Sequence, residues 1–174
     1  MSDRRPLDWN KVRGPIPWTA LLTGTFLGSG LLPKMPGTWG TLAAKPLCWW
    51  IAPESMALKI SVWTLLLCAG TWAGKKFQDL FGVADNQNIV IDEVVGVGIT
   101  SLFLARESSP LLWVAAFAFF RLFDIVKLPP VGAIDRWSKG ASAWRGGFGV
   151  MADDLVAGLQ GLIVLSVLQY FFAL

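Results

Sequence analysis

Histidine is absent from this 174-residue chain, and cysteine occurs only twice. Without an imidazole, the chain has no histidine general base, no phosphohistidine intermediate and no histidine metal ligand. Cys48 and Cys68 lie in apolar runs without zinc-ligand spacing, and neither is followed six residues later by the arginine of a cysteine-dependent phosphatase loop. We interpret both as packing residues in helices. Catalysis is therefore left to carboxylates, lysine, arginine, hydroxyl groups and water, with any metal that the carboxylates bind.

Charge is also scarce. Only 16% of the residues are charged and 54% are hydrophobic, whereas soluble domains average about 25% and roughly 45–50%. Both departures favour a membrane protein. The net charge of +3 suits contact with anionic lipid and is too small to indicate nucleic acid as a partner. The length predicts one domain, with a basic tail over residues 1–13 and one membrane-embedded domain over residues 14–174.

The uncharged segments predict an all-α fold, a compact polytopic helix bundle. Residues 155–174 have no charge and no proline, and form the clearest spanning helix. Shorter uncharged stretches span only if their charged flanks snorkel outward; these stretches are 60–74, 94–105 and 108–120. Glycine and proline interrupt residues 14–33 and 38–51, which favours a re-entrant hairpin there. We expect about four spanning helices plus this N-terminal hairpin.

Lysine and arginine indicate the orientation. They gather in the N-terminal tail, at Lys75 and Lys76, and between residues 121 and 145. Because positive residues accumulate on the cytoplasmic side of membrane proteins, all three groups are expected there. The sequence therefore predicts a multi-pass protein whose cytoplasmic end carries these groups.

Most of the few acidic residues fall at the same ends of the predicted helices. Seven of the twelve are Asp85, Asp92, Glu93, Asp124, Asp135, Asp153 and Asp154. A carboxylate at membrane depth costs about 2.5–3.5 kcal/mol and needs a partner. An acidic pair in a first helical turn is often only a cap. Two such pairs flanked by aliphatic residues exceed that need, because one serine would cap a helix at lower cost. Clustered carboxylates without histidine or cysteine favour Mg²⁺ or Mn²⁺ as their counter-ion.

Two basic segments are candidates for binding phosphate. Arg121, Asp124 and Lys127 follow an i, i+3, i+6 spacing on a helix that ends before Pro129-Pro130. They form either an ion pair at the interface or cations that hold a phosphate beside metal ligands. The second segment, residues 34–41, contains a lysine, two threonines and two glycines but no Walker A pattern. It is equally consistent with a capped turn and with a second phosphate contact.

Four motifs together resemble the phosphatidylglycerophosphatase A family. They are residues 31–44, Ile91-Asp-Glu-Val-Val-Gly96, Phe120-Arg-Leu-Phe-Asp124 with Lys127 and Pro129, and residues 147–158. Their order and spacing agree with the family from about residue 17 to the C-terminus. The resemblance implies an all-α enzyme of the bacterial cytoplasmic membrane. Its expected reaction is Mg²⁺-dependent removal of the terminal phosphate of phosphatidylglycerophosphate, giving phosphatidylglycerol.

On this basis we assign hypothetical roles to the polar residues. Glu93 is the expected general base, in a catalytic group of Asp92, Glu93, Asp124 and Asp154. The expected metal ligands are drawn from Asp92, Glu93, Asp124, Asp135, Asp153 and Asp154. The expected phosphate contacts are Lys34, Arg121, Lys127 and Arg136, assisted by the hydroxyl groups of Thr38 and Thr41. The active site should face the cytoplasm, where the charged head group of the lipid substrate is present.

Two other functions remain as alternatives. A phosphatidyl transferase also uses clustered aspartates and Mg²⁺, but its family carries Asp-Gly-x-x-Ala-Arg where residues 153–158 read Asp-Asp-Leu-Val-Ala-Gly. A transporter would need acidic residues near the middle of the membrane, whereas here they lie toward one face. The expected partners are the lipid substrate and the membrane, and the sequence leaves the oligomeric state open.

Overall fold

The computed structural model describes residues 7–82, 86–138 and 143–172. Every regular element in these ranges is a helix, as the sequence predicts. The α-helices are α1 (Pro15–Gly24), α2 (Pro36–Ile51), α3 (Met56–Phe81), α4 (Ile91–Thr100), α5 (Pro110–Val126), α6 (Val131–Ser138) and α7 (Ala143–Phe172). Two short 3₁₀ helices, η1 (Trp9–Lys11) and η2 (Ser29–Leu31), complete the set.

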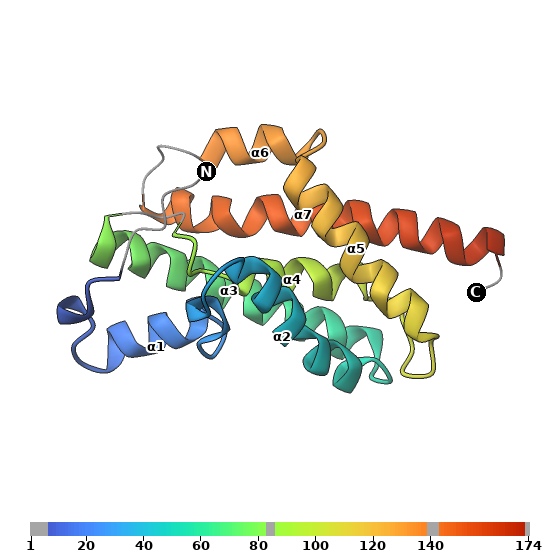
Figure 1. Ribbon diagram of the computed structural model, residues 1–174, viewed down its shortest axis with the longest axis horizontal. Coiled ribbons are helices and arrows are strands. Elements are labelled where there is room, and N and C mark those ends of the chain that lie inside the picture. The colour runs from blue at the N-terminus through green and yellow to red at the C-terminus, as the bar shows by residue number, and fades with distance from the viewer. Residues whose placement is uncertain (1–6, 83–85, 139–142, 173–174) are drawn as a thin grey trace.

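The long helix α7 organises the bundle. It runs along the length of the molecule, and α3, α4, α5 and α6 all pack against it (Figure 1). The packing on α4 is close enough for backbone contact: the Thr100 hydroxyl donates to the Gly158 carbonyl at 3.0 Å. A Cβ on Gly158 would collide with the Gly96 carbonyl. On α3, a Cβ on Gly74 would lie 3.1 Å from the Gly147 Cα. Glycine at these positions therefore lets three helices approach closely.

Two helices in the described ranges are long and apolar enough to cross a membrane. They are α3 and residues 144–171 of α7. Only 22% of the most apolar window of α3 is buried inside the protein, so most of its apolar surface faces outward, as it would toward lipid. The length and composition of these helices fit association with a membrane. Helix α4, with ten residues, measures only about 15 Å, so the predicted four-span path stays a prediction.

The N-terminal segment contains two helices joined by left-handed backbone. Between α1 and α2, positive φ values occur at Phe26, Leu27, Gly28, Lys34 and Met35. Helix α2 then packs against α4. The expected interruption of this segment by glycine and proline is present, while its re-entrant path stays a prediction.

Helix α4 is enclosed on nearly all sides. Val94 and Val97 belong to a core cluster with Phe120 of α5. Ile91 and Val95, on another side of α4, belong to a second cluster with Met151 of α7. Because both faces are held by packing, the rotation of α4 about its axis is fixed, and with it the direction of the polar residues in its first turn.

Candidate active site

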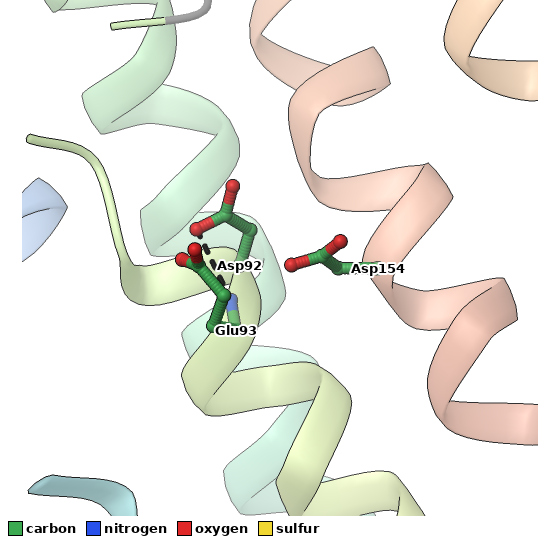
Figure 2. A group of neighbouring side chains, drawn as sticks. All are labelled: Asp92, Glu93 and Asp154. Atoms are coloured by element: carbon green, nitrogen blue, oxygen red, sulfur yellow. Dashed lines mark hydrogen bonds between the residues drawn. The ribbon is translucent and has the colours of Figure 1, made fainter. Parts of the chain in front are cut away.

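Three carboxylates from two helices converge at the start of α4. Asp92 and Glu93 come from its first turn and Asp154 from α7. Each offers one oxygen, and these oxygens all lie within 4.8 Å of one another. Figure 2 shows the Asp154 side chain pointing across from α7 toward the other two, and the Glu93 N–H donating to Asp92 Oδ1 at 3.1 Å. We call Asp92, Glu93 and Asp154 the acidic triad.

The register between α4 and α7 explains this convergence. Asp92 precedes Gly96 by four residues, and Asp154 precedes Gly158 by four residues. Gly158 packs on Gly96, and a Cβ on the next glycine of α7, Gly161, would lie 2.9 Å from the Thr100 hydroxyl. The two helices are therefore parallel at this contact. Since one helical turn separates each aspartate from its glycine, the close approach of the glycines brings the aspartates together.

A mostly buried arginine lies beside the triad. Arg121 Nη1 is 2.7 Å from Asp124 Oδ2 and 3.8 Å from Glu93 Oε1, and the three side chains are only 15–17% exposed. A Cβ on Gly37 would collide with Glu93 Oε1 and lie 3.2 Å from Arg121 Nη1. The first turn of α2 is thus in contact with both charged groups. Glu93 Oε2 is buried and makes no hydrogen bond to any described residue.

A second polar cluster adjoins the triad through Asp153. Helix α5 ends at Val126, and Lys127 adopts a left-handed conformation with φ of 50°. Its Nζ lies 2.6 Å from Asp135 Oδ1 of α6 and 2.8 Å from Asp153 Oδ2 of α7. Burial favours the neutral amine, but the hydrogen bonds to the two aspartates outweigh it and raise the pKa of Lys127 above its ordinary value. Lys127 is therefore a firmly charged cation between two carboxylates.

Comparison with known proteins agrees with this site. The family description "Phosphatidylglycerophosphatase A" matches residues 22–169. The chain belongs to the phosphatidylglycerophosphatase A family. The acidic triad, Arg121 and Lys127 all lie inside the matched range.

Three relatives show how far the similarity extends. A Haemophilus influenzae protein named phosphatidylglycerophosphatase A is 36% identical over 98% of both chains. An Escherichia coli protein of the same name is 38% identical over 82% of this chain and 78% of its own. A Bacteroides thetaiotaomicron protein, provisionally named a phosphatidylinositol-3-phosphatase, is 37% identical over 86% of this chain and 93% of its own. No solved structure matches the chain.

The remaining residues predicted to bind phosphate differ in their exposure to solvent and in their contacts. Lys34 is exposed, with a φ of 58° just before α2. Thr38 is half-buried in the first turn of α2, and the buried Thr41 donates its hydroxyl to the Gly37 carbonyl at 2.7 Å. Arg136 is exposed on α6. Asp85, which was counted among the seven acidic residues but given no role in the site, lies outside the described residues.

Two features of the site were missed by the sequence reasoning. The first is the contact of Gly37 with Glu93 and Arg121, which brings α2 to the triad. The second is the division of the Asp153–Asp154 pair between two clusters. The shared Asp-x-x-x-Gly spacing at 92–96 and 154–158 was a readable signal for the parallel register of α4 and α7.

Proposed function

We propose that the protein is a phosphatidylglycerophosphatase, which hydrolyses the terminal phosphate of phosphatidylglycerophosphate to give phosphatidylglycerol. Membership of the family, whose named relatives cover nearly the whole chain, supports the substrate. The observation that carries the chemistry is the acidic triad with Arg121 beside it. Carboxylates that bind a metal, next to a guanidinium that binds phosphate oxygens, can hydrolyse a phosphate monoester without a cysteine or histidine nucleophile.

The triad has the properties of a site for a hard divalent cation. Its donors are all oxygens, and three mutually close carboxylates repel one another unless a cation lies among them. Glu93 Oε2, buried without a hydrogen bond to a described residue, is available as a ligand or as a base. We propose that Asp92, Glu93 and Asp154 hold Mg²⁺. A bound Mg²⁺ would act as a Lewis acid that polarises the phosphoryl group and activates water.

The remaining chemistry is assigned to side chains of the protein. Arg121 is placed to bind the negative oxygens of the phosphate, and its pairing with Asp124 holds the guanidinium in one orientation. Glu93 accepts the proton of the attacking water at Oε2. The water oxygen bonds to phosphorus, the bond from phosphorus to the glycerol oxygen breaks, and that oxygen takes up a proton from the surrounding water as phosphatidylglycerol leaves.

We further propose that the site faces the cytoplasm of a bacterial inner membrane. Arg121 lies beside Glu93 of the triad, Lys127 contacts Asp153 next to Asp154, and both cations belong to the positive group between residues 121 and 145. The charge rule for membrane proteins favours the cytoplasmic side for such a region.

The experiment is phosphate release from phosphatidylglycerophosphate by the purified protein in detergent micelles. We expect inorganic phosphate with Mg²⁺ and none with EDTA. The name of the Bacteroides relative supports phosphatidylinositol 3-phosphate as a second candidate substrate, so both lipids are assayed in parallel. A higher kcat/KM for the inositol lipid would overturn our assignment. Activity only with an alcohol acceptor and a nucleotide-linked donor would instead indicate a transferase. If inorganic phosphate were released from neither lipid and no transfer occurred, a transporter would be the remaining alternative function.

A further inference from the structure

Lys127 occupies the junction between α5 and α6. Its left-handed conformation lets its N–H donate to the Phe123 carbonyl at 2.9 Å and ends α5. The chain then turns back, so that a Cβ on Gly132 of α6 would lie 2.8 Å from the Lys127 carbonyl. The lysine backbone is thus enclosed by the turn, and its side chain lies between α6 and α7.

The turn is attached to α7 at two levels. Lys127 Nζ contacts Asp153, and the Gln160 side chain donates from Nε2 to the Pro129 carbonyl at 2.9 Å. Asp153 and Gln160 are seven residues apart, about two helical turns, and so lie on the same side of α7. Lys127 also contacts Asp135, which attaches α6 to the same point. We call Lys127, Asp135 and Asp153 the clasp.

The two neighbouring aspartates of α7 serve different clusters. Adjacent helical residues point about 100° apart. Asp154 points to Asp92 and Glu93, and Asp153 Oδ2 contacts Lys127. Since the side chain of Asp153 is held by a lysine whose own backbone is enclosed, the rotation of this turn of α7 is constrained by the clasp. The contact also offsets a negative charge that would otherwise add to the three of the triad.

We infer that Lys127 and Asp135 are positioning residues, which clamp Asp153 so that Asp154 faces Asp92 and Glu93. In this assignment Asp135 and Asp153 are not metal ligands, and Lys127 is not a phosphate contact. The inference rests on the proposed function, because it concerns how the proposed metal ligands are oriented.

The test is Mn²⁺ binding to the purified protein in detergent, followed by the electron paramagnetic resonance signal of free Mn²⁺. Asp154→Asn should weaken binding more than tenfold, because it removes a ligand. Asp153→Asn, the same substitution one residue away, should change it less than threefold. Lys127→Met should weaken binding about tenfold, as the loss of supporting partners of metal ligands does. Lys127→Arg should restore it, and Asp79→Asn, in an exposed ion pair of α3, is the neutral control.

The decisive variant is the double substitution Lys127→Met with Asp153→Asn. The Asp153→Asn amide still offers an oxygen to Lys127, but neither group of the double variant can form the clamp, so its Mn²⁺ affinity should stay close to that of Lys127→Met. Recovery of the double variant to the affinity of Asp153→Asn would show that the lysine only neutralises a charge and would overturn the inference. So would Asp153→Asn binding as weakly as Asp154→Asn, or a higher KM for lipid in Lys127→Met with unchanged Mn²⁺ affinity.

Thermal melting of each variant separates these effects from unfolding, and the arginine variant does so independently. Metal binding requires no substrate. A wild-type protein that binds Mn²⁺ with the expected pattern but releases no phosphate would therefore refute the proposed function and leave the clasp supported.

Discussion

Gly37→Ala should separate activity from stability. The added Cβ would collide with Glu93 Oε1 and lie 3.2 Å from Arg121 Nη1. The colliding atom is the end of a flexible side chain, so Glu93 moves and the backbone of α2 need not. Gly37 has no positive φ, and alanine is favoured over glycine in a helix by at most about 1 kcal/mol. The thermal midpoint should therefore hold or rise slightly while activity falls.

The size of the loss follows from the displacement of Glu93. A displacement of ~1 Å in a catalytic group costs about 10²-fold in rate, which corresponds to about 2.7 kcal/mol of transition-state stabilisation. Because Glu93 is proposed both as base and as metal ligand, kcat should fall by about this factor. The assay is phosphate release from phosphatidylglycerophosphate at saturating Mg²⁺, with the thermal midpoint measured on the same sample.

A matched substitution in the same helix should behave in the opposite way. Ala43→Gly destabilises α2 by about 1 kcal/mol at a half-buried position six residues after Gly37. It should lower the thermal midpoint and keep kcat. If Gly37→Ala retained wild-type kcat while remaining folded, Glu93 would not require its present position, and its role as base would be refuted.

Three further results are expected. Asp154→Asn should reduce Mg²⁺-dependent phosphate release at least 10²-fold, and full activity in this variant would contradict the metal site. Gly158→Val should lower the free energy of unfolding by about 1–3 kcal/mol, because its side chain would displace the Gly96 carbonyl; an unchanged urea midpoint would show that α4 and α7 are not in close contact. Ala133→Cys, at an exposed position of α6 in a Cys68→Ser background, should react with a membrane-impermeant maleimide only after cells are permeabilised. Labelling of intact spheroplasts would place this end of the protein, and with it the site, outside the cytoplasm.

Much of the fold could be predicted because a membrane-spanning helix requires a long run of uncharged, apolar residues, which is visible in the sequence. The all-helical class and both long helices follow from uncharged runs and from the requirement that backbone polar groups be satisfied within each segment. The short helices were harder to predict. Helix α4 is buried by its neighbours and has only ten residues, so its length gives no indication of whether it crosses the bilayer.

The sequence predicted the acidic triad only as part of a larger set of carboxylates, because a sequence does not show in which direction each side chain points. Asp153 and Asp154 are adjacent in sequence, and both precede an apolar run, so sequence alone gives them the same role. Their division between two clusters depends on the rotation of α7, which packing against α4, α5 and α6 decides. Lys127 was expected on the same side of one helix as Arg121, and the structure places it in the turn after that helix instead. Its spacing from Arg121 assumes a continuous helix, but α5 ends one residue before it.

The dimensions of α7 indicate where the triad lies relative to the bilayer. The helix has 30 residues and measures about 45 Å, which exceeds a hydrocarbon core of ~30 Å. Its part after Asp154 is free of charge and measures about 27 Å, close to the full thickness of that core. Placing this part within the core puts Asp154 at one boundary, among lipid phosphates and water. The residues before it, which include Arg145, then extend beyond the core. A carboxylate site at the boundary suits the phosphate of a lipid head group, whereas a transport path would need its carboxylates near the middle of the membrane.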